Sequence, residues 1–145
     1  MYVQTAGIPS SWDVTGAARW LDQHTGRTTF RVAKCPATTD CITISAGKVS
    51  GGDVGSTLPQ TRHTRGGLFG GPKVSWTTTP IVIDLAQATK LKYAAADRRW
   101  LIAHELGHWA GLPHQAKRVS FMYPRMNPTP PMTVTTAERK HLASR

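Results

Sequence analysis

The segment from His104 to His114 constrains this chain most, because its histidines recur at spacings of four and six residues. On a helix, His104 and His108 lie one turn apart on the same face, where two imidazoles can bind one metal ion. Gly111 tolerates the left-handed conformation that ends a helix, and Pro113 cannot continue the helix. We therefore expect the chain to turn sharply after this helix and bring His114 to the same ion.

The chemistry expected of this site is that of a catalytic zinc ion. Three histidine ligands leave a coordination position open, whereas structural zinc sites are usually closed by a fourth protein ligand. Glu105 directly follows the first ligand, so it lies near the metal without being a ligand, where a general base for metal-activated water belongs. The pattern predicts one Zn²⁺ held by His104, His108 and His114. The alternatives are that these histidines are ordinary core or surface residues, or that zinc only stabilises the fold.

The full motif resembles the extended zinc signature H-E-x-x-H-x-x-G-x-x-H of the metzincin metallopeptidases. That family has a methionine turn downstream, and the segment Ser120-Phe121-Met122-Tyr123-Pro124 is similar to the matrixin version, in which Tyr and Pro follow Met directly. Other metzincins carry a metal-facing Tyr two residues after the Met, where this chain has Pro124. The close resemblance covers about residues 97–124.

The resemblance implies a zinc-dependent endopeptidase that acts on proteins or peptides. It implies that Met122 packs beneath the metal, and that Tyr123 and Pro124 line the pocket for the substrate residue after the cut. In metzincins an edge strand above the active site pairs with the extended substrate. The candidate for this strand is the segment Leu68, Phe69 and Gly70.

The same resemblance raises the question of further metals. Matrixins carry calcium ions and a second zinc, held by several His and Asp residues in the region before the active-site helix. In this chain the corresponding region offers only Asp53 and His63. We therefore expect neither calcium nor a second zinc.

Periodicity predicts an α+β fold with a twisted, mixed sheet of four or five strands, two long helices and a C-terminal helix. Helices are expected at residues 14–24, 98–110 and about 135–144. Asp13 or Thr15 could cap the first helix, and Asp97 the second. Thr135 and Glu138 have the spacing of a capping box at the start of the third. Strands are expected at 28–34 and 41–46, and over 74–84 as a pair or as one strand with a threonine-rich break. Residues 47–55 are expected to form a loop.

Cys35 and Cys41 bracket a five-residue loop that contains Pro36. This spacing around a turn favours a local disulfide and therefore an oxidising compartment. Two free thiols are the alternative. A secreted or extracellular protein is expected, with a cytoplasmic one as the alternative. The start Met1-Tyr2-Val3-Gln4 lacks the basic and apolar stretches of a signal peptide, so we expect the mature terminus nearby or a protein made without such a segment.

The length and net charge of the chain bear on the number of domains, on membrane spans and on charged partners. A chain of 145 residues suits one domain, 1–145, and no apolar run approaches the ~18 residues of a membrane span. Lys and Arg number 18 against 8 acids, a net charge of +10 that favours polyanions or only confers solubility. Two alternatives to a secreted, monomeric peptidase follow. One is a basic, zinc-stabilised module that binds polyanions, and the other is an intracellular protease acting on nucleic-acid-bound proteins.

Overall fold

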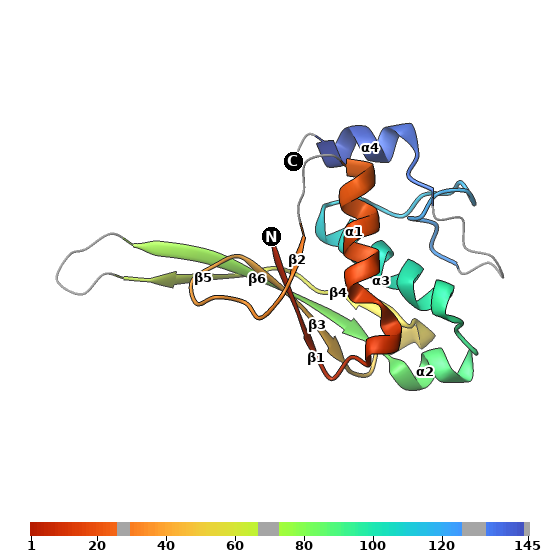
Figure 1. The fold of residues 1–145 in the computed structure, drawn as a ribbon, viewed down its shortest axis with the longest axis horizontal. Helices are drawn as coiled ribbons and strands as arrows, with labels where there is room; N and C mark the ends of the chain where they lie inside the picture. The colour runs from red at the N-terminus through yellow and green to blue at the C-terminus, as the bar shows by residue number, and fades with distance from the viewer. Residues whose placement is uncertain (26–29, 67–72, 126–132, 144–145) are drawn as a thin grey trace.

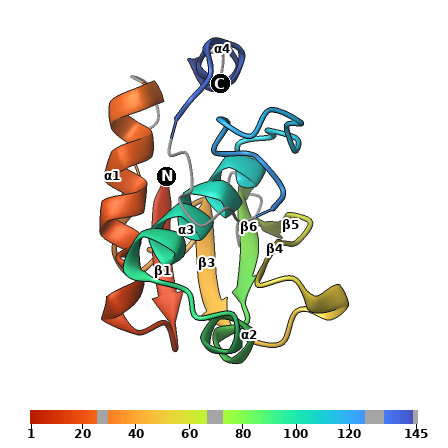
Figure 2. The same cartoon turned by 90° about the vertical axis from the view of Figure 1, so that its right-hand side faces the viewer.

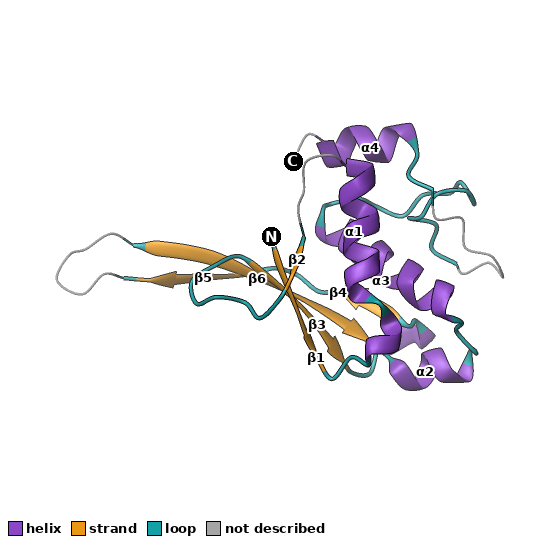
Figure 3. Cartoon of the chain, viewed as in Figure 1, coloured by secondary structure: helices purple, strands orange, loops and turns teal. Residues whose placement is uncertain are grey.

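The computed structural model describes residues 1–25, 30–66, 73–125 and 133–143 (Figure 1). Figure 3 distinguishes the helices and strands within these ranges. The strands are β1 (Tyr2–Ala6), β2 (Arg31–Val32), β3 (Cys41–Ala46), β4 (Gly55–Thr57), β5 (Thr61–Arg65) and β6 (Val74–Ile83). The helices are α1 (Val14–Thr25), α2 (Leu85–Lys90), α3 (Ala95–Trp109) and α4 (Thr136–Ala143), with short 3₁₀ turns η1 (Ser10–Trp12) and η2 (Ser50–Gly52).

The strands form one mixed sheet in the order β2-β1-β3-β6-β4. The strands β2, β1, β3 and β6 are parallel to one another, whereas β4 and β5 pair antiparallel with β6. Helices α1 and α3 lie together on one face of the sheet (Figure 2). The predicted α+β class with a mixed sheet is confirmed. The sheet has six strands because β4 and β5 follow each other along one edge of β6.

The core lies between this face of the sheet and the helices. The strand side chains that face the helices are buried with a period of two, as at Ile42 and Ile44 in β3 and Ile81 and Ile83 in β6. Burying each of these side chains stabilises the fold by about 1.5–3 kcal/mol relative to exposure. Helix α1 supplies the apolar stripe that the sequence predicts: Val14, Ala17, Ala18 and Leu21.

Several predicted boundaries differ from the structure. Of the strand predicted at 28–34, residues 28 and 29 lie outside the described residues, and within 30–34 only Arg31–Val32 form a strand. Residues 74–83 form one continuous strand, β6. Helix α3 begins at Ala95, so Asp97 is not its N-cap. Its carboxylate instead accepts the N–H of Ala94 at 2.7 Å from within the first turn. The loop predicted at 47–55 ends in a strand, because Gly55 opens β4.

The cysteine loop forms the predicted disulfide. Cys35 and Cys41 are joined, with Cα atoms 6.0 Å apart. The loop is also tied to the sheet, because Asp40 Oδ1 accepts the backbone N–H of Thr77 at 2.6 Å. No described helix is both long and apolar enough to cross a bilayer.

Replacing Cys35 and Cys41 together by Ser should lower the free energy of unfolding by about 2 kcal/mol, because a closed loop of this size restricts the unfolded chain. Urea unfolding of both proteins measures the difference. Intact mass after alkylation, with and without prior reduction, checks the bond itself. Two alkylated thiols in the unreduced parent protein would contradict the prediction.

Candidate active site

Helix α3 places His104 and His108 one turn apart and ends as the sequence predicts. Gly111 has a φ of 82°, the left-handed region that glycine tolerates. The N–H of Gly111 donates to the carbonyl of His108 at 2.9 Å, and that of Leu112 to the carbonyl five residues earlier at 3.0 Å. These two bonds make a Schellman motif, which ends the helix and reverses the chain. The reversal returns His114 to the side of α3 that carries the other two histidines.

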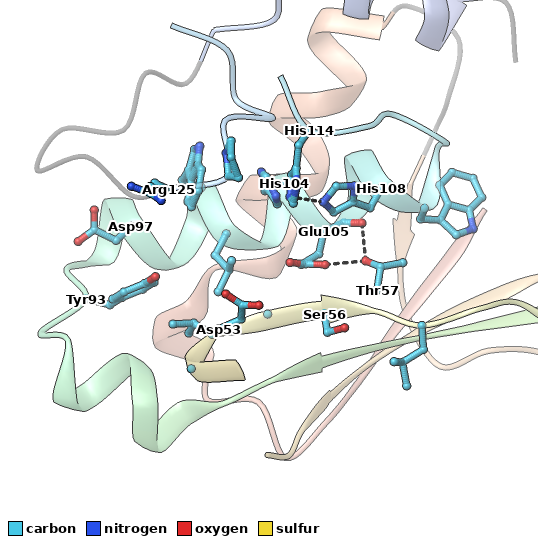
Figure 4. A pocket seen from close by; sticks show the side chains of 18 of the residues that line it. Asp53, Ser56, Thr57, Tyr93, Asp97, His104, Glu105, His108, His114 and Arg125 are labelled. Carbon is cyan, nitrogen blue, oxygen red and sulfur yellow. Dashed lines mark hydrogen bonds between the residues drawn. The ribbon is translucent and has the colours of Figure 1, made fainter. Parts of the chain in front are cut away.

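The three histidines meet at one point (Figure 4). One ring nitrogen from each of His104, His108 and His114 lies within 4.8 Å of the others. The Nε2 atoms of His108 and His114 are 3.1 Å apart. Ligand nitrogens at about 2.0–2.1 Å from a tetrahedral zinc ion lie about 3.3 Å from one another. The spacing of the rings therefore fits one zinc ion.

Backbone carbonyls orient the rings of both helical histidines. His104 Nδ1 lies 2.9 Å from the carbonyl oxygen of Phe121, and His108 Nδ1 lies 2.8 Å from that of Leu112. A carbonyl only accepts, so each Nδ1 carries the ring proton and each Nε2 presents a lone pair. The lone pair of His108 Nε2 faces His114 Nε2, so the two nitrogens are placed to bind one cation between them. The donor set therefore fits Zn²⁺ chemically as well as in spacing.

Burial keeps these histidines in the form that binds metal. Burial lowers the pKa of His104 to about 3, and it also lowers the pKa of His108. Metal binding requires neutral imidazole. Protons therefore compete with a metal at these two rings only at a lower pH than at an exposed histidine.

Glu105 follows His104 on α3 and points into the cavity beside the histidines (Figure 4). It is 3% exposed, and its Oε2 accepts a hydrogen bond from Thr57 Oγ1 at 2.7 Å. The same hydroxyl lies 3.0 Å from the backbone carbonyl of Glu105. A Cβ on Gly55 would come within 2.6 Å of Glu105 Oε1. Strand β4 therefore supports the carboxylate directly, and a side chain at residue 55 would displace the Glu105 carboxylate from this position.

The pKa of Glu105 suits proton transfer. The pKa is raised to about 7: burial raises it most, the Thr57 hydrogen bond lowers it, and the charge of Asp53 raises it. A carboxyl group with a pKa near the working pH can both take and return a proton. A cation held by the three histidines would lower this pKa.

The methionine turn packs beneath the histidines. Met122 is fully buried, and a Cβ on Gly107 would come within 2.5 Å of its Sδ. The N–H of Met122 donates to Ser120 Oγ at 2.9 Å, and the Ser120 hydroxyl donates to the buried carboxylate of Glu138. Glu138 also accepts the N–H of Thr135 at 2.7 Å, as the predicted capping box requires. The C-terminal helix α4 therefore anchors the methionine turn.

Gly107→Ala should lower the free energy of unfolding by about 1–3 kcal/mol, because its methyl group would overlap Met122 and Phe121. This loss opposes the gain of about 1 kcal/mol that Ala normally brings to a helix. Gly66→Ala is the control for an added methyl group outside a helix, since among the described residues nothing lies within 4 Å of its Cβ position. Urea unfolding measures both variants. A Gly107→Ala variant more stable than the parent would show that the turn does not pack tightly against α3.

A cavity of about 1240 Å³ opens beside the histidines and Glu105. Its walls come from α3, from β4 with the segment that follows it, and from the segment after the methionine turn. Pro124 and Arg125 line it, whereas Tyr123 is not among the described lining residues. Figure 4 shows Arg125 near Asp97 and Tyr93 at one end, with His108 and Thr57 at the other. Burial, together with the charges of Asp97 and Asp53, raises the pKa of Tyr93 to about 12.

The family model of the matrixins matches residues 13–141. The chain belongs to the matrixin family. Membership places it among the zinc metallopeptidases, which is what the histidine cluster and the methionine turn indicate independently. A search of curated proteins gave no match, and neither did a search of solved structures.

This matrixin brings most of the sequence-predicted residues together. His104, His108, His114 and Glu105 share the cavity, and Met122 lies beneath α3. The candidate edge strand Leu68, Phe69 and Gly70 lies outside the described residues. Sequence reasoning missed Gly55 and Thr57, which contact Glu105 from β4. A three-residue strand carries too little periodicity to be recognised from its own sequence.

Proposed function

We propose that this matrixin is a zinc-dependent endopeptidase that hydrolyses peptide bonds with Glu105 as the general base. The observation that supports this most is the position of the Glu105 carboxylate. It lies beside three convergent histidines, in a cavity large enough for a peptide segment. A zinc ion that served only the fold would not need a buried carboxylate of raised pKa at its side.

In the proposed mechanism His104 and His108 would hold the ion through Nε2, and His114 would supply the third ligand. Bound zinc supplies a Lewis acid that polarises the scissile carbonyl and makes water more acidic. Glu105 takes the proton of the attacking water and returns it to the leaving amine. Thr57 holds one carboxylate oxygen in place, so Glu105 keeps one orientation during both transfers.

Strand β4 is the proposed partner of the substrate backbone, and the candidate segment Leu68 to Gly70, which lies outside the described residues, stays a prediction. It pairs with β6 through one edge, and among the described residues no strand pairs with its other edge. An extended peptide can add to such an edge as a further strand. Pro124 lies on the cavity wall, in keeping with a pocket for the residue after the cut.

The setting of the reaction is also a proposal. A disulfide between Cys35 and Cys41 supports an oxidising, extracellular environment. The enzyme is proposed to act as a monomer. The expectation that calcium is not required stays a prediction. The experiment below separates this proposal from a polyanion-binding module. A protease of nucleic-acid-bound proteins is the other alternative, and free thiols at Cys35 and Cys41 together with tight DNA binding would favour it.

Incubating the purified protein with a mixed peptide library tests the proposal. Internal cleavage is expected in the presence of zinc, none after treatment with a zinc chelator, and recovery when zinc is restored. Cleavage that persists in full with chelator would contradict the zinc mechanism. A zinc-loaded protein that cleaves no library peptide and no unfolded protein would favour the binding module.

A further inference from the structure

The two strands β5 and β6 project beyond the body of the domain as a ribbon (Figures 1 and 3). We define the β5–β6 ribbon as Thr61–Arg65 paired with Val74–Thr78. Strand β3 begins at Cys41, opposite Thr78, so within the described chain it does not continue along the ribbon. Asp40 takes the N–H of Thr77 at the next position. Beyond this point the ribbon is only two strands wide.

The outer edge of the ribbon continues the edge of the active-site cleft. Strands β4 and β5 pair in succession with the same side of β6, at Thr57 opposite Ile81 and at Thr61 opposite Thr78. The residues that join them, 58–60, line the active-site cavity. Among the described residues no strand pairs with the outer edge of β5. A peptide bound along β4 can therefore extend along β5.

The ribbon carries positive charge without compensating acids. Residues 54–83 contain no Asp or Glu, while Arg62 and Arg65 project from β5 and Lys73 precedes β6, all three exposed. The nearby acid, Asp40, lies at the opposite edge of β6, against Thr77. The charge at the outer edge is therefore basic.

On one face of the ribbon, a ring stack and a side-chain hydrogen bond join β5 to β6. The ring of His63 stacks on Trp76 with centroids 5.3 Å apart and planes at 17°, and His63 Nε2 lies 2.8 Å from Thr78 Oγ1. Arg65 lies on the same face, opposite Val74 at the end of the pairing. At about 3.3 Å per residue, the positions of His63 and Arg65 lie roughly 17 and 23 Å from Thr57 along the strand direction.

We infer that the outer edge of β5, with Arg62, Arg65 and Lys73, binds an acidic segment of the substrate polypeptide. The inference rests on the proposed endopeptidase function. Thr57 and Arg125 lie at opposite ends of the cavity (Figure 4), and the wall proposed for the residue after the cut is at the Arg125 end. The chain runs on from Thr57 to β5. Arg62 and Arg65 pair with residues of β6 that lie four and seven positions from the partner of Thr57. The acidic segment therefore precedes the cut, by about four to seven residues at strand spacing.

Peptides that share one cleavable core test this inference. The first is short and does not reach the ribbon. The second adds a block of Asp and Glu four to seven residues before the cut, the third replaces that block by Ser and Gln, and the fourth places the acidic block after the cut. Arg62→Glu combined with Arg65→Glu is the test variant. Arg19→Glu combined with Arg139→Glu changes the net charge equally at exposed positions on α1 and α4.

The test variant should lower kcat/KM for the second peptide by about fivefold to tenfold, through KM, and leave the short, third and fourth peptides unchanged. The control variant should cleave all four peptides like the parent, and added salt should weaken only the preference for the second peptide. Unchanged cleavage of the short peptide also shows that the variant is folded. Arg62→Gln combined with Arg65→Gln should give a smaller loss in the same direction.

Three results would overturn the inference. They are equal cleavage of the second and third peptides by the parent, an equal loss in the control variant, and a preference for the fourth peptide. Fluorescence anisotropy on the Glu105→Gln variant adds a readout without turnover, with the second peptide and a single-stranded oligonucleotide as probes. Binding of the oligonucleotide alone would mean that the ribbon serves nucleic acid instead. If even the short peptide is not cleaved, the proposed endopeptidase function fails.

Discussion

Glu105→Gln should lower peptide hydrolysis by about 10²- to 10⁴-fold, while bound zinc stays at the parental level. The amide keeps the size of the side chain and can still contact Thr57, but it cannot take a proton from water. The three histidines are untouched, so the metal site remains. Cleavage rates and elemental zinc content, measured on the same preparation, check the prediction.

A second readout of the same variant does not depend on turnover. In the metal-free protein, burial raises the pKa of Glu105 to about 7 from an ordinary value of 4.5. The folded protein then holds this proton more tightly than the unfolded chain, so stability falls as pH rises from about 4.5 through about 7. Glu105→Gln should therefore stabilise the metal-free protein at pH 8, by as much as about 3 kcal/mol.

Asp53→Asn is the matched control for the cleavage rate. Asp53 lines the same cavity and raises the pKa of Glu105, and it is exposed. Its replacement removes a nearby carboxylate without removing the proposed base, so we expect a small change in rate. Undiminished cleavage by a zinc-loaded Glu105→Gln variant would show that another group is the base.

His108→Ala should remove both zinc and activity. The remaining pair, His104 and His114, would hold the ion with only two ligands, whereas catalytic zinc sites use three protein ligands. The loss in rate should be at least as large as for Glu105→Gln. In addition, zinc should no longer raise the melting temperature of the variant, because an ion stabilises only a folded state that binds it.

His24→Ala is the control for this replacement. His24 lies on α1, where its Nδ1 is 2.8 Å from the carbonyl of Trp20 and its ring packs against that indole. It is not one of the clustered histidines. The control should keep parental zinc content and cleavage. Retention of one zinc per chain by His108→Ala would contradict the proposed ligand set.

The elements of this fold that are predictable from sequence are those whose own residues show a clear periodic pattern of apolar or histidine side chains. The sequence predicts strand β3 and helix α1 nearly to the residue. In β3, Ile42 and Ile44 alternate with polar residues, and in α1 the buried apolar residues have helical spacing. The metal cluster was predictable for the same reason. Helical spacing brings His104 and His108 together, and Gly111 marks the reversal that returns His114.

The parts that were not predictable depend on pairing between distant segments. Strand β4 is three residues long, and it exists because Gly55 to Thr57 pair with Ile81 to Ile83 of β6. The hydrogen bond from Thr57 to Glu105 joins residues 48 apart in sequence, so no local pattern indicates it. The link from Ser120 to Glu138 joins the methionine turn to α4 in the same way.

The central claim, one catalytic zinc held by three histidines, is tested most directly by titration. Protein stripped of metal by a chelator is mixed with increasing zinc while cleavage of one peptide is followed. We predict that activity rises from near zero and reaches its maximum at one equivalent of zinc per chain. Activity that is already full without added zinc in protein shown to be free of metal, or that never appears at any zinc concentration, would contradict the account.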